Sequence, residues 1–271
     1  MTMQFLGHST VRIDLPGRVI LTDPVLTARV GPLRRVCAPL RRVDWAGVDT
    51  VLISHLHGDH LHLPSLRQLG TDVRIVVPRG AGPWLTGHGF TNVEEISPGE
   101  SITDAGLELT AIRADHAAHR WGPRLHVGPS APPIGYLIKA NGTRTYYAGD
   151  TDLVHEMTEI GEQAARLDVA LLPVWGWGPN IGPGHLDPQR AATAARLLAP
   201  RFAVPVHWGT LAVPGLCRVP GGVGSHMRAL LAEPPRQFAA AVSRLGLDTT
   251  VAIAEPGARV ALAPAGPRSD R

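Results

Sequence analysis

The chain has 271 residues, 44% of them hydrophobic and 18% charged, which is enough apolar sequence for a large core and excludes a disordered chain. It has no apolar run of about 18 residues and no basic-then-apolar N-terminus, so the sequence predicts neither a transmembrane helix nor a signal peptide. The net charge of +3 permits an anionic substrate, and no nucleic-acid partner is expected. Cys37 and Cys217 form no CxxC pair, which favours free thiols in a reducing cytoplasm.

The N-terminal part begins with predicted strands. Residues 3–14 and 19–22 read as two strands joined by a turn at Pro16-Gly17, with His8 inside the first strand and Asp23 directly after the second. Residues 26–46 contain two prolines and read as a loop. Residues 49–53 are apolar and β-branched, which predicts a short buried strand, and residues 63–69 read as a helix that stops at Gly70.

The segment Ser54–His60 joins this strand and helix, and it gathers metal-ligating side chains in one turn. His55, His57 and His60 supply imidazole nitrogens and Asp59 supplies a carboxylate, which suits zinc and also iron or manganese. The alternative is a surface loop that happens to be rich in histidine. One turn cannot complete a metal shell, but three more candidate ligands each follow a strand-like run, namely His116, Asp150 and His207.

The second half alternates predicted strands and helices. A long loop over residues 117–133, which includes Arg120 and Trp121, follows His116 and is expected to serve the site. Residues 135–139 and 144–148 form a hairpin, followed by a helix over 153–166 and a strand over 169–172. Asp187 is suited to cap a helix that runs to residue 198, so His185 lies just before its start. Residues 211–226 read as irregular, 234–245 as a helix, 251–254 and 259–263 as closing strands, and about 264–271 as a mobile tail.

The order of these motifs resembles the metallo-β-lactamase superfamily, and within it the branch of lactonases and N-acylphosphatidylethanolamine phospholipase D-like hydrolases. Besides the His-x-His-x-Asp-His motif, the resemblance depends on five segments and extends over about residues 7–260. They are Gly7-His8-Ser9-Thr10, Asp23-Pro24, Ala148-Gly149-Asp150-Thr151, His185-Leu186-Asp187-Pro188 and His207-Trp208-Gly209-Thr210. The chain departs from the phospholipase-like members at Gly58 and His62, where they carry Tyr and Asp.

The resemblance implies an α/β (α+β) fold in one domain over residues 1–271, built as a four-layer αββα sandwich of two packed sheets with helices outside. It also implies two divalent metal ions, zinc in the first place and Mn²⁺ or Fe²⁺ as alternatives. The implied ligands are His55, His57 and His116 for the first ion, Asp59, His60 and His207 for the second, and Asp150 as a bridge between them. In the family, Asp23 supports the ligand loops from outside the metal shell.

The implied activity is hydrolysis by a hydroxide held between the two ions. The implied catalytic residues are Asp59, His185 and His8: His185 stabilises the oxyanion or anchors the leaving group, and His8 assists unless it is a strand histidine that faces water. A small-molecule or lipid phosphodiester is the expected substrate, with a lactone or other ester as the alternative. Two other classes are a di-iron oxidoreductase, whose members carry Glu where this chain has His57, and a non-catalytic binding protein, against which the complete ligand set argues.

Two similar segments, Leu33-Arg34-Arg35-Val36 and Leu40-Arg41-Arg42-Val43, bring four arginines into the loop over residues 26–46. Arginines with aliphatic residues between them are suited to bind phosphate or an anionic membrane surface. The alternative is a solvated connector whose arginines cover apolar surface. The sequence therefore leaves open a peripheral membrane contact by a protein otherwise expected in the cytoplasm, and it does not indicate an oligomeric state.

Overall fold

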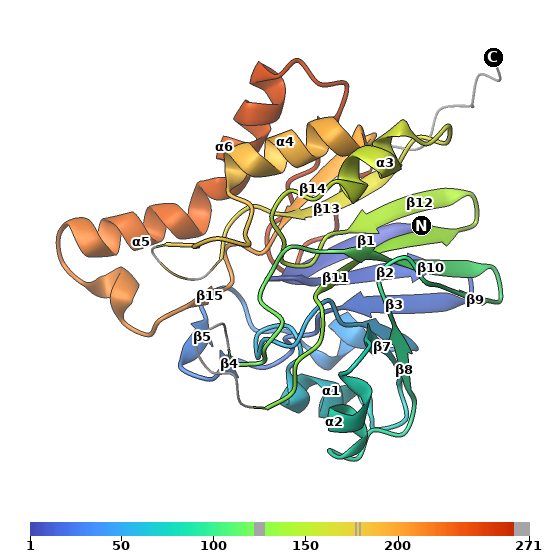
Figure 1. Cartoon of the computed structure of the whole chain (residues 1–271). Coiled ribbons are helices and arrows are strands. Elements are labelled where there is room, and N and C mark those ends of the chain that lie inside the picture. Colours follow the sequence, from blue (N-terminus) through green and yellow to red (C-terminus); the bar gives the residue numbers. More distant parts are fainter. Residues whose placement is uncertain (122–127, 177, 179, 263–271) are drawn as a thin grey trace.

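The computed structural model describes residues 1–121, 128–176, 178 and 180–262. Two β-sheets pack face to face, and helices cover the outer face of each sheet, which gives four layers (Figure 1). This arrangement confirms the αββα sandwich predicted from the sequence. Within the described residues, no helix combines the length and the apolar character needed to cross a bilayer.

The first sheet contains, in the order of its hydrogen-bonded neighbours, β1 (Thr2–Gly7), β2 (Thr10–Leu15), β3 (Arg18–Thr22), β6 (Thr50–Leu52), β7 (Arg74–Pro78) and β8 (Val93–Ile96). The second contains β16 (Thr250–Val251), β14 (Phe202–Val206), β13 (Val169–Pro173), β12 (Thr143–Tyr147), β11 (Ile134–Ala140), β10 (Leu107–Arg113) and β9 (Ser101–Asp104). A small third sheet contains β15 (Leu211–Ala212), β5 (Leu33–Arg35) and β4 (Arg29–Val30). The helices are α1 (Leu63–Leu69), α2 (Gly82–Thr86), α3 (Glu156–Glu162), α4 (Pro188–Leu198), α5 (Gly222–Ala232) and α6 (Pro234–Arg244), with 3-10 turns η1 (Arg42–Trp45) and η2 (Leu216–Arg218).

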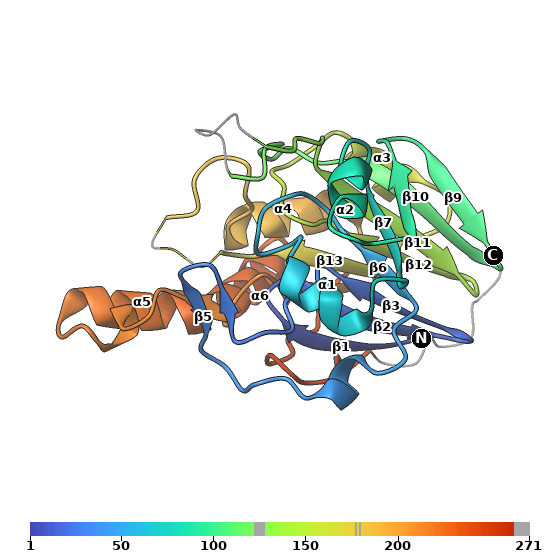
Figure 2. The same ribbon diagram turned by 90° about the horizontal axis from the view of Figure 1, so that it is seen from below.

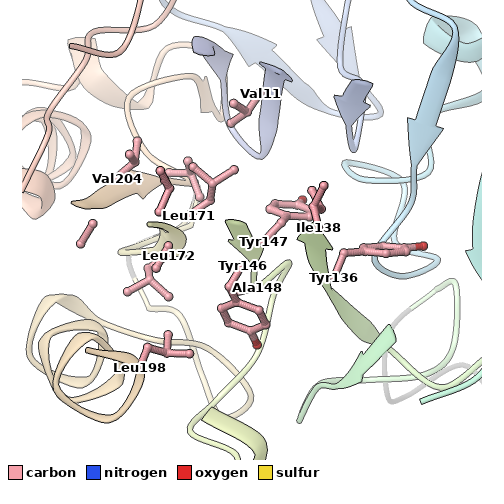
Figure 3. Close-up of a cluster of buried hydrophobic side chains, with 14 of the residues drawn as sticks. Val11, Tyr136, Ile138, Tyr146, Tyr147, Ala148, Leu171, Leu172, Leu198 and Val204 are labelled. Atoms are coloured by element: carbon pink, nitrogen blue, oxygen red, sulfur yellow. The ribbon is translucent and has the colours of Figure 1, made fainter. Parts of the chain in front are cut away.

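The main core lies between the two large sheets, and the alternation of side chains along each strand explains how it forms. Leu171 and Leu172 are neighbours on β13, so their side chains point to opposite faces of the sheet. Figure 3 shows Leu171 on the side of Val11 from β2, and Leu172 on the side of Leu198 from α4. Each of these buried side chains contributes about 1.5–3 kcal/mol, so one strand ties the opposite sheet and the helix layer together.

The directions of the strands bring the candidate site residues to one edge of the sandwich. Within the first sheet β1, β3 and β6 run in the same direction, and within the second sheet β10, β12 and β14 do so. The segments that follow these strands carry the candidate residues, namely His8, Asp23, His55 to His60, His116, Asp150 and His207. The carboxyl ends of parallel strands are the usual place for ligand sites in open α/β sheets.

Two predictions for the N-terminal part are wrong. Residues 3–14 form two strands, β1 and β2, because the chain turns at His8 and Ser9, where His8 has a left-handed backbone with φ of 55°. Residues 26–46 are not a plain loop, since β4 and β5 form a hairpin there and η1 follows. Strands of two or three residues are too short for an alternating pattern to reveal them in the sequence.

In the C-terminal part, the prediction that residues 211–226 are irregular is wrong, because they contain β15, η2 and the start of α5. Gly221 and Gly222 are poor helix formers and conceal this start. Gly224 is needed, since a Cβ there would lie 2.1 Å from the carbonyl oxygen of Val219. The observed helix α3 is shorter than the helix predicted over 153–166. In place of the two predicted closing strands, the described residues contain β16 and an isolated β-bridge at Arg259. The predicted tail over about 264–271 lies outside the described residues.

Candidate metal centre

Three imidazoles from the two sheets meet at the edge of the sandwich. His55 and His57 come from the turn after β6, and His116 comes from the segment after β10. His57 Nδ1 lies 3.0 Å from His55 Nε2 and 3.0 Å from His116 Nε2. The three nitrogens surround a small common space, so these residues form one candidate set of ligands.

A second set lies beside the first. His60 Nε2 lies 3.2 Å from His207 Nε2, and Asp150 Oδ2 lies 3.2 Å from each of these nitrogens. Asp59 Oδ2 lies 4.0 Å from His60 Nε2. Asp150 also groups with His116 of the first set, so its carboxylate lies between the two sets. The structure thus brings all seven predicted ligands together, and their binding of metal stays a prediction.

Backbone and carboxylate oxygens fix how the ring nitrogens are protonated. His116 Nδ1 donates to the carbonyl oxygen of Gly184 at 2.7 Å, and His207 Nδ1 donates to that of Trp175 at 2.5 Å. His60 Nδ1 donates in the same way to a buried carboxylate. An oxygen of this kind accepts only, so Nδ1 carries a proton in each ring and Nε2 is the nitrogen that faces the common centre.

The arrangement fits a divalent cation. Asp150 Oδ1 is buried and has no hydrogen-bond partner among the described residues, a condition that costs free energy. Ring nitrogens also lie only 3.0 to 3.2 Å apart within each set. A cation satisfies the carboxylate oxygen and coordinates these nitrogens together. Imidazole nitrogen and carboxylate oxygen are ligands that zinc, iron and manganese accept.

Burial and neighbouring charges set the charge of each group. Burial lowers the pKa of His116 to about 4 and that of His55 well below its ordinary value, so both are neutral at pH 7, as metal binding requires. Burial opposes the ionisation of Asp150, but His207 and His60 outweigh it and hold the pKa of this carboxyl well below its ordinary value. Burial by itself would lower the pKa of His60. Asp150 and a second carboxylate outweigh burial and hold this pKa well above its ordinary value, so a proton competes with a cation at His60.

That second carboxylate belongs to Asp23, which is fully buried and connects loops from both sheets. Its Oδ1 accepts from the backbone N–H of Ser54 at 2.7 Å, and its Oδ2 accepts from His60 Nδ1 at 2.6 Å and from the hydroxyl of Tyr147 at 2.5 Å. Ser54 Oγ also donates to Asp23 and lies 2.9 Å from His55 Nδ1. This is the supporting place expected for Asp23, whereas the contribution of Tyr147 was not predicted.

His8 lies in the turn between β1 and β2, fully buried behind Asp59. Its Nε2 is 3.1 Å from Asp59 Oδ2, and its backbone N–H donates to Thr210 Oγ1 at 2.6 Å. The alternative that His8 is a strand histidine facing water is therefore wrong. His8, Asp23 and His207 have positive φ angles of 55°, 32° and 63°. Such strained backbones gather at functional sites, and here they turn three side chains toward one centre.

An open cavity of about 540 Å³ gives access to both sets of ligands. His185 lies in its wall, with Nε2 3.7 Å from Asp150 Oδ2 and its ring centroid 4.6 Å from that of His116. The side chain of His185 is 25% exposed, so a bound substrate can contact it. Arg120 and Trp121 also line the cavity, which agrees with the expected role of their loop.

A smaller and mainly apolar pocket of about 310 Å³ adjoins this cavity beside Asp59. Val30 and Leu33 from the β4–β5 hairpin supply apolar wall, and His62 supplies a polar side chain. His62 Nδ1 lies 2.8 Å from Ser65 Oγ, and burial lowers the pKa of His62 to about 4, so its ring is neutral at pH 7. The pocket is therefore suited to an uncharged group next to the metal ligands.

The four arginines predicted as one loop are divided between two places. Arg34 and Arg35 lie on β5, whereas Arg41 precedes η1 and Arg42 begins it. Arg35 points inward, and its Nη1 donates to the carbonyl oxygen of Leu6 at 3.0 Å. Arg35 is therefore partly engaged by the protein itself, and a membrane contact of the four arginines stays a prediction.

Comparison with known proteins places this geometry in a family. The family model of the beta-lactamase superfamily domain matches residues 18–208. A metal-dependent hydrolase of Methanopyrus kandleri is 31% identical over 95% of this chain and 98% of its own length. An N-acyl-phosphatidylethanolamine-hydrolyzing phospholipase D of Caenorhabditis elegans is 29% identical over 76% of this chain and 63% of its own length. A solved metallo hydrolase of Ignicoccus hospitalis has a TM-score of 0.71 and 25% identity over 96% of this chain and 98% of its own. The chain therefore belongs to the beta-lactamase superfamily, in the family of metal-dependent hydrolases that these relatives represent.

Proposed function

We propose that the protein uses two divalent cations, zinc in the first place and Mn²⁺ or Fe²⁺ as alternatives, to hydrolyse a phosphodiester. The observation that carries the proposal is the convergence of ring nitrogens from both sheets on the carboxylate of Asp150. The ligands we assign are His55, His57 and His116 for one cation, Asp59, His60 and His207 for the other, and Asp150 for both.

Bound divalent cations supply a nucleophile from water near neutral pH and stabilise negative charge on the reacting group. The chain itself supplies orientation. Asp23 holds His60 and Ser54, and His8 holds Asp59, so these two ligands, His60 and Asp59, are fixed from outside the shell. His8 is buried and acts through Asp59, which makes it a positioning residue in this proposal.

His185 is the group that we propose acts on the substrate. Its Nδ1 lies 3.2 Å from the carbonyl oxygen of Pro183, which orients the ring. Its Nε2 lies on the side of Asp150 and the cavity. A protonated His185 can donate from Nε2 to an oxygen of the substrate, and so stabilise the developing oxyanion or the leaving group.

The pockets favour a substrate that joins a phosphodiester to an apolar group. The apolar pocket beside Asp59 is placed to hold that group while the ester lies over the metal ligands. Similarity to a phospholipase D supports a phosphodiester. A lactone or other ester is the second candidate. It would present a similar developing oxyanion to the metal ligands and to His185.

The test combines metal analysis with two substrate classes. Protein purified without chelator is expected to carry about two metal ions per chain and to hydrolyse bis(4-nitrophenyl) phosphate, and chelation should abolish this activity. An aryl ester and a lactone are measured in parallel. Hydrolysis of the esters alone would select the second candidate. Absence of metal after purification and after addition of zinc, manganese or iron would reject the metal centre itself.

A further inference from the structure

Four arginines surround a second cavity, of about 630 Å³, next to the small third sheet. Arg34 and Arg35 come from β5, Arg218 from η2 and Arg228 from α5. β5 pairs with β15, and α5 projects from the sandwich on the same side of the molecule as β5 (Figures 1 and 2). None of the four arginines belongs to the candidate metal centre, so this cavity is a separate feature.

No carboxylate of the described residues pairs with the positive charges of this cavity. No Asp or Glu lines the cavity, and within the described part of the chain none of the four guanidinium groups pairs with a carboxylate. Arg228 donates to the carbonyl oxygen of Cys217, and Arg35 donates to backbone carbonyls. Arg34 and Arg218 are exposed and make no side-chain hydrogen bond to a described residue. Like charges held around one cavity repel each other, and a bound anion relieves this repulsion.

Exposed aliphatic side chains accompany the arginines. Val36 and Val213 line the cavity and are 50% and 37% exposed. Val219 and Val223, at η2 and the start of α5, are 40% and 54% exposed. Valines in contact with water next to a basic cavity match the two parts of an anionic phospholipid, since arginine binds the phosphate and the apolar rim meets the acyl chains.

We propose that this arginine cavity binds a phosphate group, in the first place the headgroup phosphate of an anionic phospholipid. One guanidinium group can donate two parallel N–H bonds to the oxygens of a phosphate. Arg34 and Arg218 line the cavity, and their donors form no hydrogen bond to a described residue. The valine rim favours a headgroup over a soluble phosphate. This site differs from the single arginine loop expected from the sequence. It combines Arg34 and Arg35 with Arg218 and Arg228, which come much later in the chain, and Arg41 and Arg42 do not line it.

The experiment compares the metal-loaded full chain with two matched double variants. Arg218→Ser/Arg228→Ser removes two charges from the cavity, and Arg41→Ser/Arg42→Ser removes two charges outside it. Each protein is sedimented with vesicles of phosphatidylcholine alone or mixed with phosphatidylglycerol, and is titrated with inorganic phosphate by calorimetry. Phosphate bound at the metals contributes equally in all three proteins and cancels in the comparison. Melting temperature and metal content establish that the variants are folded.

We expect the wild type and the control variant to bind anionic vesicles, and the cavity variant to bind them at least about tenfold more weakly. High salt should weaken binding because it screens the arginines. If the cavity variant alone loses binding of inorganic phosphate and none of the three proteins binds vesicles, the site is supported and its ligand is a soluble phosphate. Equal binding by all three proteins, or none, would overturn the proposal. If the double variant does not fold, Arg34→Ser, at an exposed position on β5, is expected to weaken binding at least about threefold and serves as the second test.

Discussion

At the scale of single residues, Asp150 is the side chain on which the candidate centre depends most. One carboxylate oxygen lies 3.2 Å from ring nitrogens of His60 and His207, and the other is buried without a hydrogen-bond partner in the part of the chain that the structure describes. We expect Asp150→Ala to lower the rate of phosphodiester hydrolysis by at least about 100-fold and to reduce the metal content, because both cations lose a shared ligand. Steady-state rates and elemental analysis of the same preparation test this. Full metal content together with full activity would contradict the bridging role.

Replacement of His185, at the same cavity, is expected to lower activity without lowering the metal content. Its side chain reaches the cavity, and its Nε2 lies farther from Asp150 than those of His60 and His207, at 3.7 Å. We expect His185→Ala to lower the maximal rate about 100-fold while the metal content stays as in the wild type, because a lost oxyanion donor affects only the transition state. If the variant loses metal, His185 is a ligand and the assignment of the second set must change.

Gly149 shows how one residue can fix the distance between two loops. Its φ is +62°, and a Cβ there would lie 2.5 Å from Cβ of Ser54. Gly149→Ala therefore strains the backbone and pushes the Asp150 loop away from the loop of Ser54, so we expect a loss of about 2–4 kcal/mol in the free energy of unfolding. Gly17→Ala is the matched control: its φ is +73°, but nothing lies within 4 Å, so about 1 kcal/mol is expected. Urea unfolding of both variants makes the comparison, and equal losses would show that the contact with Ser54 is unimportant.

At the scale of elements, Arg120 clamps the turn that carries His55 to His60 from outside. Its Nη1 donates to the carbonyl oxygens of Leu56 and Leu61, one on each side of the Asp59 and His60 pair, at 2.6 and 3.1 Å. Its guanidinium lies 4.3 Å from the ring centre of Trp84 on α2. The turn is thus tied to the loop over residues 117–121 and to a helix at once. The side chain is buried, so these bonds lie largely out of water.

We expect Arg120→Ala to lower the affinity for metal about 10- to 100-fold, the range known for groups that orient ligands. Arg120→Lys separates charge from geometry. A lysine keeps the charge but lacks the planar group that stacks on Trp84 and reaches two carbonyl oxygens, so it should restore little of the affinity. Competition with a metal-binding dye measures both variants. Complete rescue by lysine would mean that charge alone matters and that no clamp exists.

The elements also show what the sequence can and cannot predict. The turn from His55 to His60 is contiguous, and the strand before it and the helix after it have clear patterns, so its candidate ligands could be named before the fold was known. The clamp by Arg120 could not, because it depends on which carbonyl oxygens lie nearby in three dimensions. The start of helix α5 was concealed by Gly221, Gly222 and Gly224, which helix propensity penalises, although the preceding turn requires Gly224 because a Cβ there would meet the carbonyl oxygen of Val219. The arginine cavity joins residues 34 and 228, which no local pattern connects.

At the scale of the whole molecule, the candidate ligands come from both halves of the sandwich. The turn after β6 of the first sheet supplies four, and the segments after β10, β12 and β14 of the second sheet supply His116, Asp150 and His207. Cations bound to all of them would link the two sheets at one edge, while Asp23 links the same loops by hydrogen bonds. Metal binding and folding should therefore be coupled, since the unfolded chain has no preformed site.

Removal of the metal is expected to lower the melting temperature of the whole chain. A ligand that binds only the folded state at 1,000 times its dissociation constant stabilises that state by about 4 kcal/mol, and for a chain of this size each kcal/mol changes the melting temperature by about 2–4 °C. A drop of about 10 °C on chelation, reversed by added zinc, is the expected result in calorimetry. His185→Ala, which is not a ligand in our assignment, should show the same drop, whereas His116→Ala should start lower and change less, since its site is already incomplete. A chelated protein that has lost its metal but melts at the original temperature would show that the cations do not hold the sheets together, and that the hydrogen bonds of Asp23 suffice.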